Sequence, residues 1–463
     1  MNKGASHANA RGIANGSLTT DPYRLAVYAL LLVTVGRIHQ HFSFISALRP
    51  GELVVGIAVL YALVRRDAVN LSVLHQWPVT LVGALFIWAC VTAPFGLSLG
   101  GSGAFVLFTY SKVLVTALLL VIAVRGTADL RGLVWAYLLS CGVLVIFAWT
   151  VFDISQAAGS QAMRLGNLYM YDANDIGLLF SIGIPFGLWL ARATRGKGRV
   201  LSLLIVLGMV ATIARSGSRG GFLGLIAVAA ALFFLVREVS WGTKILIAGA
   251  SVLVLSFAAP PGYWQQMETM TEPTDDYNWE SYYGRRQTWE RGIGYMLENP
   301  ITGVGIDNFN RAEGMYSERA QRIQRQGGTG RLRWHSAHNT FVQVGSELGI
   351  PGLALYSLLV LGSFWKLRKW NRRLPASWRR RYGDRQLLYL ATVYLPVAIV
   401  GYLVTSSFLT FAYLQPVYIL AALTAATIYL LRREVTSQRA GTVDARRGSA
   451  RPSSGKHIRS RSA

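Results

Sequence analysis

Two histidines three residues apart are the first candidates for chemistry in this sequence. His335 and His338 lie in the stretch Trp334-His335-Ser336-Ala337-His338-Asn339, just before an apolar run. A neutral imidazole at this position can remove a proton from a hydroxyl group. A zinc pair is a second interpretation, but no H-E-x-x-H sequence or cysteine cluster supplies further ligands. A histidine that only makes structural hydrogen bonds is the third.

Two pairs of arginines are the second group of candidates. Arg215 and Arg219 lie between two apolar runs, in a stretch rich in serine and glycine. Arg285 and Arg286 open an amphipathic piece of a long polar segment. The forked guanidinium group matches the oxygens of a phosphate, and a following helix N-terminus adds a positive dipole. These residues therefore predict a diphosphate-binding site.

Acidic residues offer a simpler explanation for some of these charges. Arg285 or Arg286 could pair with Glu280 or Glu290 on the same segment. Glu347 lies inside an apolar run, where an ionisable group needs a partner. Helical geometry points Glu347 away from His338, so we expect its partner on another helix.

The composition indicates what must position these residues. The chain has 463 residues, of which 52% are hydrophobic and 15% charged, and its mean hydropathy is +0.36. Soluble domains carry about 25% charged residues, so an ordinary soluble enzyme is excluded. The net charge of +24 could indicate nucleic-acid binding. The basic residues, however, lie between apolar runs and in the tails, which is typical of membrane topology, and no nucleic-acid partner is expected.

Apolar runs near spanning length occur throughout the chain. We therefore predict an all-α polytopic membrane protein with about 12 transmembrane helices, nine within residues 23–260 and three within 338–431. The runs cover residues 23–46, 50–64, 78–96, 105–124, 132–152, 174–191, 200–214, 220–236, 243–260, 339–365, 386–408 and 411–431.

The distribution of lysine and arginine predicts the orientation. Alternate connections are strongly basic, and the positive-inside rule places them in the cytoplasm together with both chain ends. Residues 1–22 are expected to be a flexible cytoplasmic N-terminus, and residues 432–463 a disordered basic cytoplasmic tail. The tail is a candidate for contact with membrane lipids, although a solvated tail is the simpler interpretation.

One connection on the outer side is much longer than the others. Residues 261–337 form a predicted loop on the outer face, and loops of this length are usually functional. Helical spacing predicts a short helix over Arg285–Asn299, ended by Pro300 and the following glycines, so the loop is expected to be partly helical. Aromatic residues of the loop are candidates for stacking on sugars or for anchoring at the membrane interface. They are Trp264, Tyr277, Trp279, Tyr282 and Tyr283.

Several signatures of other enzyme classes are missing from the sequence. It contains no Walker A sequence, no G-x-G-x-x-G, no G-x-S-x-G and no Asp-x-Asp pair. Cys90 and Cys141 each lie inside an apolar run, so a disulfide framework is not expected. We therefore expect neither a cofactor nor a bound metal ion.

Three stretches resemble the O-antigen ligase family, the Wzy-C-type bacterial membrane glycosyltransferases. The first is Ser218-Arg219-Gly220-Gly221-Phe222-Leu223. The second is Gly284-Arg285 before Trp289, followed by Asn299-Pro300-Ile301-Thr302-Gly303-Val304-Gly305. The third is Ala337-His338-Asn339-Thr340-Phe341, which continues to Glu347-Leu348-Gly349-Ile350-Pro351-Gly352.

The resemblance implies an activity and a set of site residues. Such proteins transfer a glycan from undecaprenyl diphosphate to an acceptor at the periplasmic face of the Gram-negative inner membrane, and in the ligases the acceptor is lipid A–core. The family's essential histidine corresponds to His338. One of its arginines corresponds to Arg219 or Arg215. The other corresponds to Arg285 or, if the alignment shifts by one residue, to Arg286. We expect His335 and Asn339 to help bind the substrate.

The resulting hypothesis is an inverting, metal-independent O-antigen ligase. His338 would act as the general base, and the arginines would hold the diphosphate. Within the same superfamily, an O-antigen polymerase or a protein O-oligosaccharyltransferase is the alternative. A lipid-glycan transporter, which belongs to another class, would show related halves and binding groups at mid-membrane.

Overall fold

The computed structural model describes residues 21–156, 163–166, 171–271, 284–326, 335–379 and 383–449. The first half of the chain contains α1 Pro22–Leu31, η1 Leu32–Gly36, η2 Ile38–Gln40, α2 Ser43–Ala47, α3 Pro50–Val64, η3 Arg66–Ala68, η4 Leu71–His75, α4 Trp77–Thr92, η5 Ala93–Phe95, α5 Leu99–Phe105, η6 Val106–Tyr110, α6 Ser111–Ile122, α7 Thr127–Thr150, β1 Ile154–Gln156, β2 Met163–Leu165, α8 Ala173–Ala193 and α9 Lys197–Ser216.

The second half is also almost entirely helical. It contains α10 Arg219–Leu235, α11 Trp241–Ala258, α12 Tyr263–Glu268, α14 Arg285–Glu298, α15 Phe309–Tyr316, α16 Glu318–Arg325, α17 Thr340–Arg373, η8 Ala376–Arg379, α18 Asp384–Ser406 and α19 Gln415–Ser449. The short antiparallel pair β1–β2, in which Ser155 faces Arg164, was not predicted from the sequence.

Nine helices in the described part of the chain are long and apolar enough to cross a membrane. Three shorter apolar helices, at Pro22–Gly36, Pro50–Val64 and Arg219–Leu235, occupy three of the other predicted segments. The protein is thus an all-α polytopic membrane protein in its main architecture, while the count of 12 spans remains a prediction.

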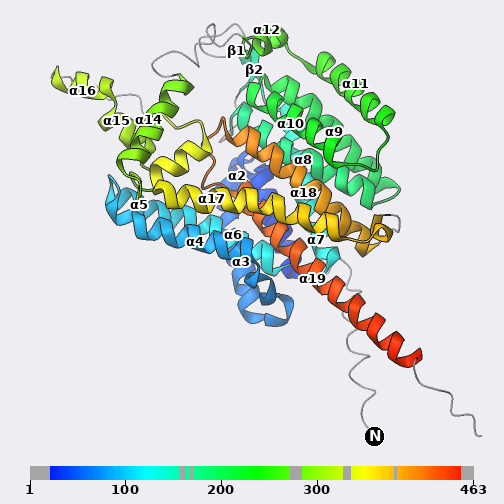
Figure 1. Cartoon of the computed structure of the whole chain (residues 1–463). Coiled ribbons are helices and arrows are strands. Elements are labelled where there is room, and N and C mark those ends of the chain that lie inside the picture. Colours follow the sequence, from blue (N-terminus) through cyan, green and yellow to red (C-terminus); the bar gives the residue numbers. More distant parts are fainter. Residues whose placement is uncertain are drawn as a thin grey trace, which may run out of the picture.

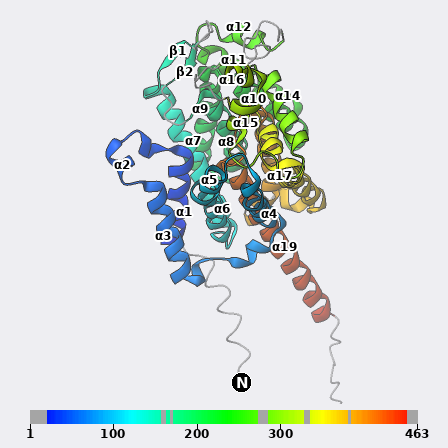
Figure 2. The same cartoon turned by 90° about the vertical axis from the view of Figure 1, so that its left-hand side faces the viewer.

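Helices α8 and α18 form the centre of the bundle. They pack against each other, and α7, α9, α10 and α17 surround them. Figure 2 shows α1, α2 and α3 on one side of the bundle and α14 on the opposite side. Helix α11 packs against α9 and is the least buried of the nine candidate spans. Helices α14, α15 and α16 project from one end of the bundle (Figure 1).

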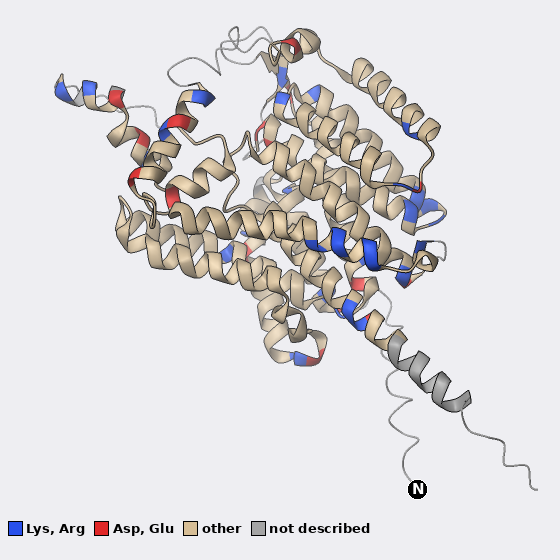
Figure 3. Cartoon of the chain, in the orientation of Figure 1, with Lys and Arg blue, Asp and Glu red and all other residues tan. Residues whose placement is uncertain are grey.

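The opposite end of the bundle is rich in lysine and arginine, and we call it the basic end. Figure 3 shows blue segments there on the last turns of α17 and on α19, whereas acidic and basic residues alternate along α14–α16. The predicted disordered tail at 432–463 needs a correction, because α19 continues as a helix to Ser449. The reason is local: after Pro416 in the first turn, no proline or run of glycines interrupts residues 417–449. Residues 450–463, like the predicted flexible residues 1–20, lie outside the described part.

The long connection at 261–337 is partly helical, as predicted. Helix α14 spans Arg285–Glu298, which confirms the helix expected over Arg285–Asn299. Trp264 lies on α12, edge-on to Phe222 of α10. The other aromatic residues proposed for sugar stacking, Tyr277, Trp279, Tyr282 and Tyr283, lie outside the described residues, as does Glu280.

Helix α17 is broken inside the predicted membrane span. Gly349 has φ 68° and ψ −171°, so the helical hydrogen bonding is interrupted there. The loop after α14 enters this break: the amides of Val304 and Gly305 donate to the carbonyls of Ser346 and Glu347 at 2.8 and 3.0 Å. In a membrane interior, a backbone carbonyl without a partner is strongly unfavourable. The loop therefore supplies the partners that the broken helix lacks.

The side chain of Glu347 also binds this loop. Its carboxylate oxygen accepts from the amide of Phe309 at 3.0 Å, at the start of α15. Glu347 is almost fully buried, and Gln343 lies 3.5 Å from its other oxygen. The expectation that Glu347 pairs with a segment other than the one carrying His338 is confirmed.

Replacing Gly349 with alanine should destabilise the protein. A Cβ atom at this position would collide with the carbonyl of Ile301, and its positive φ is unfavourable for alanine by ~1 kcal/mol or more. We expect the midpoint of thermal unfolding in detergent to fall by several degrees. Gly249→Ala on α11, where a Cβ meets no atom within 4 Å, is the matched control and should cause no loss. Equal midpoints for the two variants would contradict this account of the break.

Candidate functional site

His338 lies in the turn that leads into α17. Its backbone is left-handed, with φ 45°, a conformation that is uncommon for residues other than glycine. The amide of His338 donates to the hydroxyl of Thr410 at 3.0 Å, and Thr410 belongs to the connection between α18 and α19. The side chain is exposed. Strained backbone of this kind is typical of functional sites, where surrounding contacts hold it in place.

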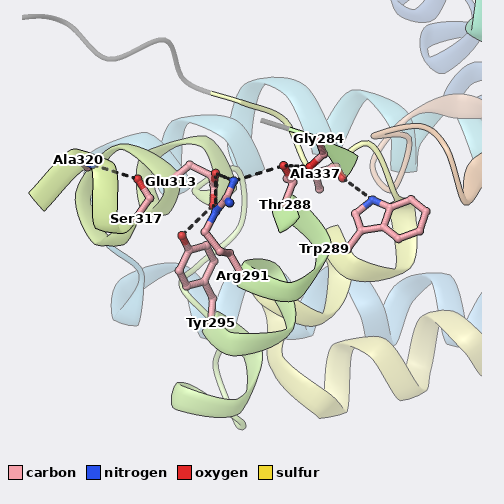
Figure 4. Close-up of polar contacts among 9 residues, drawn as sticks. All are labelled: Gly284, Thr288, Trp289, Arg291, Tyr295, Glu313, Ser317, Ala320 and Ala337. Atoms are coloured by element: carbon pink, nitrogen blue, oxygen red, sulfur yellow. Dashed lines mark hydrogen bonds and ion pairs between the residues drawn. The ribbon is translucent and has the colours of Figure 1, made fainter. Parts of the chain in front are cut away.

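Helix α14 fixes the residue that precedes His338. The indole nitrogen of Trp289 donates to the carbonyl of Ala337 at 3.1 Å, as Figure 4 shows. Ala337 itself is fully buried. Arg285 lies four residues before Trp289, so both side chains are on the same face of α14. The helix that holds the backbone of the histidine therefore also presents an arginine to it.

The electrostatic surroundings keep His338 neutral. Burial by the surrounding protein and the positive charge of Arg285 lower the pKa of His338 to about 4. His335 lowers this pKa further, whereas the negative charge of Asp172 raises it. The imidazole is largely surrounded by protein, although part of the residue remains accessible. A neutral imidazole at pH 7 can accept a proton.

Arg285 is the first residue of α14 and is half-buried. Its guanidinium carbon lies 5.6 Å from the ring centre of Phe408, in the same connection that binds His338 through Thr410. Phe408 also lies near the ring of Trp289, with 6.2 Å between ring centres. The structure thus places Arg285 near His338. Phe408 packs between α14 and the neighbouring helices.

Arg219 is the first residue of α10 and lies beyond Phe408. Its guanidinium donates to the hydroxyl of Thr269, just after α12, at 2.9 Å. A Cβ atom added to the next residue, Gly220, would lie 3.6 Å from Cβ of Phe408. The backbone at Gly220, the residue after Arg219, and the side chain of Arg285 therefore approach the same phenylalanine.

Arg215 points elsewhere. Its Nε donates to the carbonyl of Ala148 at 2.9 Å, and its guanidinium carbon lies 4.7 Å from the ring centre of Trp149. Both partners are near the C-terminus of α7, where an arginine stabilises the free carbonyls and the helix dipole. The structure thus gives Arg215 structural contacts and does not bring it to His338.

Arg286 forms the ion pair that was considered as the simpler explanation. Its Nε lies 3.1 Å from the carboxylate of Glu290, one turn later on α14, and both side chains are more than half exposed. An exposed pair of this spacing contributes little to stability. Arg286 is therefore a surface residue beside the site.

His335 and Asn339 flank the catalytic candidate differently. His335 is half-buried and within electrostatic reach of His338. Asn339 caps α17, because its side-chain oxygen accepts from the amides of Phe341 and Val342 at 2.9 and 3.2 Å. The capping accounts for an asparagine at this position without a substrate.

Several residues at the site were not singled out from the sequence. They are Asp172, Thr269, Phe408 and Thr410. Asp172 caps α8, and the side chain of Asn174 in its first turn accepts a hydrogen bond from Ser218, the cap of α10, at 2.6 Å. The first turns of α8, α10, α14 and α17 therefore lie around the site. Helix N-termini favour anions, in agreement with the predicted diphosphate site.

A buried ion pair supports α14 from the side opposite His338. Arg291 contacts Glu313 of α15 through two guanidinium nitrogens, at 2.6 and 2.9 Å, and Tyr295 donates to the same carboxylate at 2.8 Å (Figure 4). The side chains of Arg291 and Glu313 are only 17% and 5% exposed. Paired, low-exposure contacts of this kind fix geometry more firmly than surface pairs.

No group of three or more His, Cys, Asp or Glu side chains in the described ranges is placed to hold a metal ion. Metal independence stays a prediction.

Replacing Glu313 with glutamine should loosen the lobe formed by α14 and α15. Arg291 would then be a buried charge without its ionic partner, which is unfavourable by roughly 3 kcal/mol. We expect faster hydrogen exchange of the α15 amides and a lower unfolding midpoint. Glu290→Gln, which removes an exposed ion pair on the same helix, is the matched control and should have little effect. A similar response of both variants would show that the buried pair has no special role.

Comparison with known proteins adds independent information. Residues 201–357 match the profile of a family described as O-Antigen ligase. This range contains Arg215, Arg219, Arg285, Arg286 and His338, as well as the break in α17. No curated protein is significantly similar to the chain. Members of the matched family are glycosyltransferase-like enzymes of the O-antigen ligase or polymerase type. The match agrees with the resemblance seen in the sequence: residues 201–357 of this membrane protein are similar to the O-antigen ligase family.

Proposed function

We propose that this protein is an O-antigen ligase that transfers a glycan from undecaprenyl diphosphate to lipid A–core. The observation that carries the proposal is the state of His338: its side chain is exposed, its pKa is lowered, and Arg285 lies nearby. This combination supports a base that is available at neutral pH beside a cation suited to a phosphate.

The reaction needs one proton acceptor and one stabilised leaving group. His338 takes the proton from a hydroxyl of the acceptor sugar as that oxygen bonds to the anomeric carbon of the donor glycan. The bond between the anomeric carbon and the diphosphate oxygen breaks at the opposite face, and the configuration inverts. The electron pair leaves with undecaprenyl diphosphate, which is already a stable anion. Paired carboxylates of the kind used by glycosidases are therefore not required.

The arginines serve the leaving diphosphate. Arg285 and Arg219 are the best candidates, because both start helices and both segments approach Phe408. Their charges, together with the helix N-termini, would stabilise the negative charge that grows on the diphosphate. Arg215 is less well suited because its guanidinium is directed to the end of α7, and Arg286 because it lies on the exposed surface of α14. Asn339 and His335 would position the histidine.

The location follows from the charge distribution. The basic end of the bundle would face the cytoplasm by the positive-inside rule, so the site at the opposite end would face the periplasm. A polyprenyl donor could then reach the site from within the membrane. We propose a multi-pass protein of the Gram-negative inner membrane, with the projecting helices α14–α16 covering the site from outside.

Replacing His338 with alanine should abolish glycan transfer. Loss of a general base lowers the rate by about 10²- to 10⁴-fold, while the protein should remain folded. The assay uses purified full-length protein, an undecaprenyl-diphosphate-linked glycan, and either lipid A–core or a second lipid-linked repeat as acceptor. His75→Ala on η4 is the control for histidine replacement.

The two acceptors distinguish the ligase from its relatives. Transfer to lipid A–core supports the ligase, whereas transfer only to the second lipid-linked repeat would identify a polymerase. Undiminished transfer by the alanine variant would overturn the role of His338 in either enzyme.

The pH dependence of transfer should lack the usual histidine transition. Because neutral His338 is the active form and its pKa is lowered to about 4, protonation should inactivate the enzyme only well below pH 6. We therefore expect kcat/KM to stay nearly constant from pH 8 to about pH 5.5. A half-maximal value close to pH 6.5 would mean that the imidazole titrates like a free histidine.

A further inference from the structure

The last turns of α17, at the basic end, carry a concentrated positive surface. We call it the α17 basic surface; it consists of Lys366, Arg368, Lys369, Arg372 and Arg373, together with Arg432 of α19. These side chains line two adjoining cavities of about 180 and 380 Å³. Lys369 and Arg373 line both cavities, so the surface is continuous around the end of the helix.

The charges of this surface have no acidic partners within the described ranges. Other arginines at the same end do: Arg385 lies 2.7 Å from Glu434, and Arg192 lies 3.6 Å from Glu238. None of the six residues of the α17 basic surface forms an ion pair with a described residue. Five such cations at the end of α17 and a sixth on α19 create a strong attraction for an anion.

Arg368 indicates where such an anion would bind. The residue is half-buried, and one of its terminal nitrogens, Nη1, is buried without a hydrogen-bond partner among the described residues. Arg237 and Arg372 are within electrostatic reach, as is Glu238. Glu238, however, already pairs with Arg192 and accepts a hydrogen bond from Tyr389. A buried guanidinium donor without an acceptor is unfavourable, and a small rotation of the flexible side chain toward a ligand oxygen would satisfy it.

An apolar stripe leads along α17 to this arginine. Leu358, Leu361 and Trp365 are 54%, 43% and 63% exposed, and Arg368 and Arg372 continue the same spacing of three and four residues. Side chains with this spacing lie on one face of a helix. Along one face, α17 thus presents leucine, leucine and tryptophan within the predicted span, followed by two arginines at its end.

We propose that this face of α17 binds an anionic glycerophospholipid. The phosphate oxygens would accept from Arg368 and Arg372 at the end of this face, and the acyl chains would lie along Leu358, Leu361 and Trp365. The sequence of apolar, aromatic and basic residues matches the order of acyl chains, interface and headgroup in a bilayer leaflet. The phosphate ester is the recognised group, and the apolar stripe selects a lipid over a soluble phosphate.

Membrane topology alone does not account for this arrangement. The positive-inside rule explains why basic residues lie at this end, and a helix C-terminus favours cations. Neither explains the apolar stripe that ends at Arg368. Lys197 and Arg199 provide a comparison, because they are exposed basic residues in the first turn of α9 and line neither cavity.

The test measures lipid binding to the full-length protein in detergent by native mass spectrometry. Phosphatidylglycerol, zwitterionic phosphatidylcholine and inorganic phosphate are added separately and in competition. Arg368→Gln/Arg372→Gln should weaken phosphatidylglycerol binding by about 30-fold, the factor for two basic contacts. Lys197→Gln/Arg199→Gln removes the same charge elsewhere and should change binding by no more than about threefold. If the double variant does not fold, Arg372→Gln alone should give a loss of about fivefold.

Three results would overturn the proposal. Equal losses in the two double variants would show that the lipid responds only to overall surface charge. Equal binding of phosphatidylcholine would show that the charge of the headgroup is not recognised. Full displacement of phosphatidylglycerol by inorganic phosphate would indicate a site for a free anion. The readout is independent of glycan transfer, so it does not depend on the proposed enzymatic function.

Discussion

The hydrogen bonds that join the loop at Val304–Gly305 to the broken part of α17 are the constraint on which the site depends. A helix interrupted within a membrane exposes backbone carbonyls that have no water to bind. Here the loop after α14 supplies amides to the carbonyls of Ser346 and Glu347, and the indole of Trp88 donates to Leu348 at 2.9 Å. Loop and helix therefore form one structural unit, and neither can take this conformation without the other.

Contacts of this unit connect the interior of the bundle to the site. The carboxylate of Glu347 binds the first amide of α15, and a buried ion pair joins α15 to α14. Helix α14 in turn binds the carbonyl of Ala337 through Trp289 and presents Arg285. The position of His338 is thus set by a succession of short contacts that begins in the apolar core, although the residue itself is exposed.

The sequence predicts most of the helices because a bilayer imposes both their length and their apolar character. It also predicts α14 from its spacing, and the resemblance pointed to His338 and Arg285 as parts of one site. Features that depend on tertiary partners could not be predicted. In the sequence, Gly349 looks like a glycine that allows close helix packing. Its role in the break becomes clear only when the loop that binds there is known. Likewise, nothing in the sequence near Arg215 indicates that it turns to α7, and Thr410 lies in a short connection without a recognisable pattern.

The position of α11 would link the site to the thickness of the bilayer. This helix packs against α9, is the least buried of the candidate spans and leads directly into α12. Because Thr269, which holds Arg219, directly follows α12, a change in the tilt of α11 would be passed to that arginine. Such a helix adapts to hydrophobic mismatch by tilting, at a modest cost in free energy. The acyl-chain length of the surrounding lipids would thereby adjust the separation of the two arginines that begin α10 and α14.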